Sequence, residues 1–385
     1  MSSTIFQENH RRRLSGSDYF RAVAPRICIN AFILVSACAC LVLDPRSRIA
    51  ARRRITSRGL MPQCCGFCPS EPQRLSYAVL MTPETALAPL PPALSGERFE
   101  FESAAGRLSY YQIAPHQGAG AAPPMLLIHS LNAAGSAAEM RPVYEHYGAS
   151  RAVYAVDLPG FGFSDRSDRA YLPRLMTDAV HALVARIRAD HNGAKVDALG
   201  LSLGCEFVAR AAQESPADFS TVALVSPTGF NGKKPRLGPP ESLVGSYRAQ
   251  RVLAWSGWSD GLFRQLTRPG VIRFFLEKTW GSKQIDEALL QYDILTTRQP
   301  GAKHAPLYFL SALLFSADIM HVYDALQMPT WLVHGVRGDF VDYRLKSRFA
   351  NAANWSVDVM TTGAIPYFEV PHEFFAKYDA FLARQ

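Results

Sequence analysis

Short apolar runs alternate with longer amphipathic segments through residues 97–385. Met125–Ile128, Val222–Val225 and Trp331–Val333 contain no charged residue. Strands without polar positions are buried on both faces, as in a parallel sheet covered by helices. Between such runs, Leu172–Ile187 places apolar residues at i, i+3, i+4 and i+7, which predicts an amphipathic helix. The pattern therefore predicts an α/β fold, with a mostly parallel central sheet and helices on both faces.

The flanking segments extend this alternation. Residues 98–101 and 108–111 alternate around a small-residue turn and predict a β-hairpin. The pattern also predicts strands over 152–156 and 357–360, and helices over 136–147 and 371–384. We assign 97–229 and 328–385 to the sheet-containing core.

Residues 230–327 interrupt the rhythm of strands and helices. This stretch is helix-like in pattern and rich in aromatic residues, among them Trp255, Trp258, Phe274 and Trp280. We predict a helical cap over the carboxyl ends of the strands. Packing accounts for most of its aromatic residues, and we expect the remainder to face the pocket and make it apolar.

Residues 1–80 differ in composition from the rest of the chain. They contain twelve arginines, no lysine and four acidic residues, whereas basic and acidic residues are equal in number beyond position 80. The predicted folded body thus lacks the basic footprint of a nucleic-acid-binding protein. We interpret 1–80 as a disordered extension or as the product of a gene start placed too far upstream. The alternative is an inner-membrane anchor formed by Ile27–Leu43, a run slightly short for a membrane span.

Cysteines are also concentrated at the beginning of the chain. Six of the seven precede residue 69, and only Cys205 lies in the body. A body without paired cysteines suits a reducing compartment, so we predict a cytoplasmic location. The spacing Cys65–Cys68 has no second pair or nearby histidine to complete a metal site. Nothing in the sequence indicates a metal, cofactor or nucleotide, and it does not determine the oligomeric state.

The segment Gly200-Leu201-Ser202-Leu203-Gly204 joins an apolar strand to an alanine-rich helix over 206–213. Glycines at both ends of the motif allow a sharp turn that displays the serine hydroxyl above the sheet, at the N-terminus of the helix. An ordinary glycine–serine turn is the alternative. The strand before and the helix after the motif favour a nucleophile elbow with Ser202 as the nucleophile.

Several motifs in this order resemble those of the α/β-hydrolase superfamily, over about residues 97–385. They are His129-Ser130-Leu131-Asn132, the block Asp157–Asp165, the Ser202 turn, a helical cap after the fourth strand, and the run His334–Asp339. The resemblance implies that Ser202 is the nucleophile and that the backbone N–H groups of Leu131 and Leu203 form the oxyanion hole. It implies Asp339 as the acid that orients the base, with Asp342 a weaker candidate. The block Asp157–Asp165 is expected to be structural.

The chain departs from the superfamily where the catalytic histidine is expected. In the run Gly363–Pro371, Ala364 occupies that position. A serine without a general base is a poor nucleophile at neutral pH. His372 is the candidate for a relocated base, and His129 and His334 lie at the correct ends of their strands.

Two functions remain open on this basis. The first is a serine hydrolase-like enzyme, carboxylesterase- or lipase-like, which acts through Ser202 on an apolar ester or related acyl substrate with a weakened base. The second is a non-catalytic protein of the same fold that binds an apolar ligand or a partner. Association with a membrane is expected only if Ile27–Leu43 is an anchor.

Overall fold

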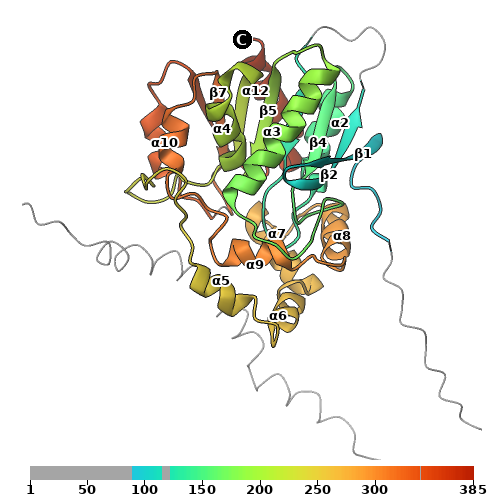
Figure 1. The fold of residues 1–385 in the computed structure, drawn as a ribbon. Helices are drawn as coiled ribbons and strands as arrows, with labels where there is room; N and C mark the ends of the chain where they lie inside the picture. Colours follow the sequence, from blue (N-terminus) through green and yellow to red (C-terminus); the bar gives the residue numbers. More distant parts are fainter. Residues whose placement is uncertain (1–88, 115–121, 339) are drawn as a thin grey trace, which may run out of the picture. The chain divides into compact units, whose positions relative to one another are not determined.

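The computed structural model describes residues 89–114, 122–338 and 340–385. These residues form an eight-stranded sheet in the order β1-β2-β4-β3-β5-β6-β7-β8 (Figure 1). The pairs β1–β2 and β2–β4 are antiparallel, and every other neighbouring pair is parallel. The mostly parallel sheet predicted from the apolar runs is confirmed.

The strands lie close to their predicted positions, and both the hairpin and the apolar run 125–128 are found. Their bounds are β1 Glu97–Ser103, β2 Gly106–Ile113, β3 Met125–Ile128, β4 Val153–Asp157, β5 Val196–Leu201, β6 Phe219–Val225, β7 Thr330–Gly335 and β8 Trp355–Met360. In the hairpin, Ser103 pairs with Gly106 across the turn.

Helices cover both faces of the sheet. The core helices are α2 Arg141–Gly148, α3 Pro173–Asp190, α4 Gly204–Glu214, α11 Pro366–Glu369 and α12 Pro371–Leu382, with short 3-10 turns η2 Ala137–Met140, η3 Pro216–Asp218 and η4 Arg344–Phe349. Helices α3 and α4 lie on one face, and α2 and α12 lie on the other (Figure 1). Alternation along β3 divides the core accordingly: Leu126 and Ile128 pack toward α3 and α4, whereas Met125 and Leu127 pack toward α2 and α12.

The stretch between β6 and β7 is helical, as predicted. It holds α5 Tyr247–Leu253, α6 Ser259–Leu266, α7 Pro269–Trp280, α8 Glu287–Thr296, α9 His304–Leu310 and α10 Ile319–Asp324. Two of these helices contact loops that follow strand carboxyl ends. The N–H of Ala364, after β8, donates to the carbonyl of Thr279 in α7. A Cβ atom on Gly160, after β4, would meet Ala305 in α9 at 2.3 Å.

Helix α10 behaves differently from the rest of the insertion because it packs beside α4 of the core. A buried ion pair between Arg210 and Asp318, 2.6 Å long, joins the two segments. A second link is formed by Glu206, which accepts from Arg236 at 2.7 Å and from the N–H of Ser316 at 2.9 Å. The insertion is therefore anchored to the helix that follows Ser202.

The predictions made for residues 1–80, including the anchor Ile27–Leu43, lie outside the described residues. Among the helices that are described, none combines the length and the apolar character needed to cross a bilayer.

Candidate functional site

Ser202 occupies a sharp turn between β5 and α4. Its φ angle is +53°, in the left-handed region that non-glycine residues seldom adopt. Its N–H donates to the carbonyl of Val225 at the end of β6, 2.8 Å away. Such strain persists only where the surrounding structure imposes it, and it often marks a functional site.

The flanking glycines are required by close backbone approaches. A Cβ atom on Gly204 would lie 2.4 Å from the carbonyl oxygen of His129, and one on Gly200 would lie 3.0 Å from the backbone nitrogen of Cys205. A side chain at position 204 would separate the Ser202 turn from the loop that follows β3, and one at position 200 would force the turn away from the start of α4. Gly204 therefore holds Ser202 and Leu131 on adjacent loops.

The Ser202 side chain is partly exposed, and its hydroxyl makes no hydrogen bond with any residue that the structure describes. It stands immediately before α4, an eleven-residue helix that starts at Gly204. The partial positive charge at a helix N-terminus stabilises negative charge that develops nearby. The geometry thus gives Ser202 an accessible hydroxyl in an electrostatically favourable position.

Two backbone N–H groups beside Ser202 are also left without partners. Leu131 and Leu203 are almost fully buried, at 2% and 1% exposure. Among the described residues, neither backbone N–H finds an acceptor. Buried N–H groups are nearly always hydrogen-bonded, because leaving them unpaired is costly. A pair of such donors flanking a serine is suited to hold an oxyanion.

Glu139, from η2, organises the loop that carries Leu131. Its carboxylate accepts from the N–H and the hydroxyl of Ser130, at 2.7 and 3.0 Å, and from the side-chain amide of Asn132 at 2.9 Å. Burial raises the pKa of Glu139 to about 7. These hydrogen bonds could not be predicted from the sequence, because Glu139 lies in a segment predicted only as a helix.

Asp293, from α8 of the insertion, approaches Glu139. Its side chain is 3% exposed, and its Oδ1 atom is buried without a hydrogen-bond partner among the described residues. Burial, and then the nearby Glu139 carboxyl, raise the pKa of Asp293 well above its ordinary value. The insertion therefore places a second acidic group beside the loop that carries Leu131, a contact that the sequence could not reveal.

His129 is buried, with both ring nitrogens in use. Nδ1–H donates to the carbonyl of Ser130 at 2.5 Å, and Nε2 accepts from the N–H of Leu158 at 3.0 Å. Burial lowers the pKa of His129. It acts as a clamp between the loops after β3 and β4, and it has no nitrogen available to accept a proton from Ser202.

His334, in β7, also has both ring nitrogens in hydrogen bonds. Nδ1–H donates to the carbonyl of Gly335 at 2.6 Å, and Nε2 accepts from the Lys346 ammonium at 3.0 Å. The ring stacks on Tyr343 with centroids 3.8 Å apart. Burial lowers the pKa of His334, and the Lys346 charge lowers it further. The two alternative histidines at strand ends are therefore both structural.

His372 is exposed, in the first turn of α12. Burial lowers the pKa of His146, and the nearby His372 lowers it further. His146 belongs to the last turn of α2, shortly before β4 begins, and it stacks on Phe375 with centroids 3.7 Å apart. His372 therefore faces the α2–α12 surface, and the structure gives it no contact with Ser202.

Ala364 lies close to Ser202 through a chain of hydrogen bonds. The Ser226 hydroxyl donates to the carbonyl of Ala364 at 2.7 Å. Ser226 directly follows Val225, the residue that accepts from the N–H of Ser202. The position where the resemblance leads one to expect a histidine is thus beside the Ser202 turn, and alanine offers no imidazole there.

The loop that carries Ala364 is well ordered by its neighbours. Glu369 accepts from the N–H of Gly363 and from the Arg337 guanidinium, both at 2.6 Å. A Cβ atom on Gly363 would lie 2.4 Å from the carbonyl oxygen of Trp280 in α7. The loop therefore keeps a defined conformation against the insertion without a histidine.

Asp339, predicted as the acid, lies outside the described residues. Asp342, the weaker candidate, is exposed and serves its own loop. It accepts from the N–H of Gly232 at 2.9 Å and pairs with Arg344 at 3.2 Å. Asp342 therefore has a local structural role.

The block Asp157–Asp165 is structural, as expected. The buried Asp157 carboxylate accepts from the N–H groups of Ala137 and Phe163, at 2.9 and 3.0 Å. Gly162 has a φ of +48°, and a Cβ atom there would lie 1.9 Å from the Asp157 carboxyl carbon. The carboxylate thus draws the loop after β4 into a compact turn.

The described fold is similar to those of several solved hydrolases. A probable hydrolytic enzyme from Pseudomonas aeruginosa PAO1 is 20% identical, with a TM-score of 0.55 over 74% of this chain and 93% of that chain. An enol-lactonase from Burkholderia xenovorans LB400 is 18% identical, with a TM-score of 0.56 over 74% of this chain and 100% of that chain. An esterase from Exiguobacterium antarcticum is 15% identical, with a TM-score of 0.56 over 75% and 100% of the two chains. These similarities establish the α/β-hydrolase fold.

Comparison with curated protein sequences gave no match. A family model described as serine aminopeptidase, S33, matches residues 141–362, which is more than half of the chain. The match includes the Ser202 turn, the helical insertion and the strands on either side of it. The protein is therefore a member of the serine aminopeptidase S33 family of α/β-hydrolases.

Proposed function

We propose that this protein is a serine hydrolase that forms an acyl-enzyme through Ser202, with Leu131 and Leu203 as the oxyanion donors. The observation that carries the proposal is a strained, partly exposed Ser202 beside the buried residues Leu131 and Leu203, whose backbone N–H groups have no hydrogen-bond partner among the described residues. Donors fixed in this way stabilise the tetrahedral intermediate without reorganisation. Asp339 and a cap formed by α7, α8 and α9 are parts of the same proposal.

Among the described residues, no histidine contacts Ser202, and this bears on the substrate class. Cleavage of an amide requires a proton for the departing amine, which the triad histidine normally delivers. An ester or lactone with a good leaving group needs no such proton. We therefore propose an activated, apolar acyl ester as the substrate, although the family description names an aminopeptidase.

The rate expected from such a site is low but measurable. Oxyanion stabilisation and binding alone retain roughly 10³- to 10⁴-fold acceleration over water when triad members are removed. A proton from Ser202 would pass to solvent or hydroxide, because His129 and His334 use both ring nitrogens and His372 is remote in its contacts. The rate should accordingly rise with pH.

A fluorophosphonate probe tests this proposal on the full-length protein. Labelling of the wild type, and slow turnover of short and medium p-nitrophenyl esters, are expected, because both require only the nucleophile and the oxyanion donors. Ser202→Ala should abolish both. Ser256→Ala, an exposed serine on the insertion, is the matched control and should retain them. Unlabelled wild type under conditions that label a known serine hydrolase would contradict the proposal.

A non-catalytic, ligand-binding role is the second candidate. It is favoured by one observation: both strand-end histidines are committed to structural hydrogen bonds. Under this alternative, medium-chain acyl ligands protect the protein against heat, and Ser202→Ala binds them as tightly as the wild type. Thermal shift with a non-hydrolysable ester analogue, run beside the labelling assay, separates the two functions.

A further inference from the structure

Helix α5 and the turn that follows it form an exposed aromatic surface. Trp255 and Trp258 are 56% and 47% exposed, and Val252 and Tyr247 are also exposed. The two indoles contact each other edge to face, with centroids 4.6 Å apart. Large apolar side chains gathered in this way on a protein surface mark a site of interaction. We call Tyr247, Val252, Trp255 and Trp258 the tryptophan surface.

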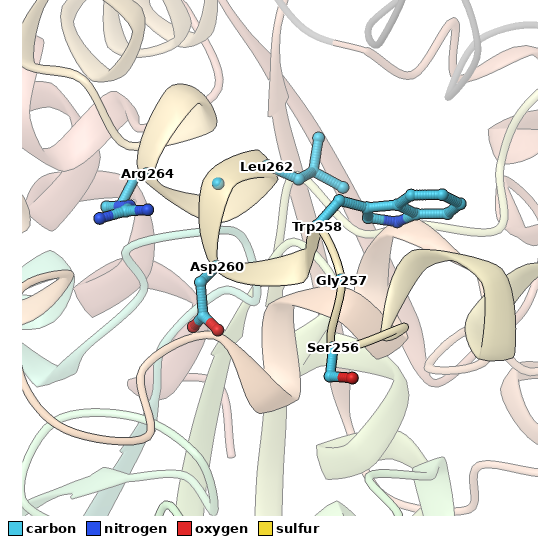
Figure 2. A pocket seen from close by; sticks show the side chains of 7 residues that line it. Ser256, Gly257, Trp258, Asp260, Leu262 and Arg264 are labelled. Atoms are coloured by element: carbon cyan, nitrogen blue, oxygen red, sulfur yellow. The ribbon is translucent and has the colours of Figure 1, made fainter.

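Helix α5 contacts α9 of the insertion, but its apolar side chains Tyr247 and Val252 remain exposed. None of its seven residues is buried. Helices this short are unstable in water unless they pack against something. The tryptophan surface borders a hollow of about 660 Å³ lined by Ser256–Trp258, Asp260–Leu262 and Arg264. Among the residues that line this hollow, Figure 2 shows Trp258 and Leu262 to the right and Asp260 and Arg264 to the left. Ser202, Leu131 and Leu203 are not among its lining residues.

Arginines surround the tryptophan surface. Arg248, Arg251, Arg264 and Arg268 are exposed, and within the described ranges none of them forms an ion pair. The acid in this region, Asp260, is paired with Lys303 at 2.7 Å. The guanidinium groups are therefore available to anionic groups outside the protein.

The charge of the insertion contrasts with that of the remaining body. Residues 230–282 contain nine basic and three acidic residues. Because residues 81–385 are balanced overall, the rest of the body carries an excess of acidic groups. A negatively charged planar surface would therefore attract the insertion more strongly than the rest of the body.

We propose that the tryptophan surface and its arginine rim dock on an anionic lipid surface. Tryptophans prefer the headgroup level of a bilayer, because their rings are amphipathic. The Trp258 Nε1–H donates to the carbonyl of Val252 at 3.0 Å, so no unpaired donor opposes burial of that ring. Arginines beside apolar groups are typical of helices that lie in the plane of the interface.

A second copy of the chain fits this surface less well. A two-fold symmetric contact would place the same patch on both partners, and arginines would face arginines. Lipid phosphates neutralise that charge instead. This docking gives the protein an affinity for membranes that does not depend on Ile27–Leu43. It also brings the insertion to the lipid bilayer, where apolar esters accumulate.

Tryptophan emission of the full-length protein provides a direct test. All five tryptophans lie in the described residues, and Trp280, Trp331 and Trp355 are already buried. A blue shift on addition of vesicles therefore reports on Trp255 and Trp258, and the tryptophan-free segment Ile27–Leu43 cannot produce it. We expect the shift with equimolar phosphatidylglycerol and phosphatidylcholine vesicles, and a much smaller shift with phosphatidylcholine alone.

Variants sharpen the test. Arg248→Glu combined with Arg251→Glu should weaken partitioning onto the anionic vesicles at least tenfold, since each cation near such a surface contributes about fivefold. Trp255→Ala combined with Trp258→Ala should reduce co-flotation by a similar factor. The matched control reverses Lys195 and Arg384, two exposed cations at the amino end of the sheet, and should partition like the wild type.

Three outcomes would overturn the proposal. They are an unchanged emission spectrum with anionic vesicles, an equal loss in the control variant, and a blue shift that appears without vesicles and grows with protein concentration. The last result would identify the surface as a contact between copies of the chain.

Discussion

The turns at Ser202 and at Ala364 lie beside each other at the proposed site, and they differ in the chemical groups that they present. The turn at Ser202 keeps a strained serine and two unpartnered N–H groups next to it. The backbone of Ala364 keeps its hydrogen bonds to Thr279 and to the Ser226 hydroxyl, but this turn carries a methyl group where the resemblance leads us to expect an imidazole. The difference indicates that packing and backbone hydrogen bonds maintain the Ala364 turn without an imidazole.

The substitution Ala364→His tests this difference between the two turns directly. If the second turn has lost only its imidazole, the substitution should raise kcat/KM for p-nitrophenyl esters by roughly 10²- to 10⁴-fold, the usual contribution of a general base. Steady-state kinetics from pH 6 to 9 would show it, with activity gained above the new pKa of the histidine. Ala364→Gln, similar in size but without a basic nitrogen, is the control, and an equal gain in that variant would refute the interpretation.

The loop beside the Ser202 turn is tied to Glu139, and this gives a pH prediction. The folded protein raises the pKa of Glu139 from 4.5 to about 7, so between these values the folded state holds a proton that the unfolded chain has released. Stability should therefore fall as the pH rises from 4.5 to 7, by about 3 kcal/mol from this group. Glu139→Gln should remove that part of the slope.

Urea unfolding at several pH values checks the Glu139 prediction. The pKa of Asp293 is also raised, by burial and then by Glu139. Its titration should therefore leave a residual dependence of stability on pH in Glu139→Gln. Asp293→Asn is the companion variant and should remove part of that residual slope. A slope in Glu139→Gln identical to that of the wild type would show that Glu139 is ionised in the folded protein.

Glycine substitutions compare the packing of the two turns. A Cβ atom at Gly204 or at Gly363 would lie 2.4 Å from a backbone carbonyl oxygen, so each change to alanine should cost about 1–3 kcal/mol. Only Gly204→Ala should also reduce fluorophosphonate labelling, because it displaces Ser202 from Leu131. Gly261→Ala, with no atom within 4 Å of the added Cβ, is the control and should be neutral or slightly stabilising. Equal labelling of both turn variants would contradict the distinction.

Most of the fold was predictable from the sequence. The apolar runs located β3, β6 and β7, because a strand covered on both faces excludes polar residues. The helix predicted over 172–187 was found as α3, since its apolar stripe has helical spacing over four turns. The short α11 was not predicted, because four residues are too few for a periodic pattern.

The site was only partly predictable. The sharp turn at Ser202 was predicted because such a turn is local in sequence, with its glycines at fixed spacing. Glu139, Asp293 and Ser226 were not, because each acts through a contact with a residue distant in the chain. The committed nitrogens of His129 and His334 were likewise invisible, since a histidine at a strand end can be either a base or a clamp.

The sequence by itself therefore determined the layered α/β architecture and the sharp turn at Ser202, because these depend on residue type and short-range spacing. The tertiary structure decided which histidines are available, which carboxyl groups are buried together and which tryptophans remain outside. Those properties arise from how separate segments pack against one another, and packing sets burial, hydrogen-bond partners and pKa values.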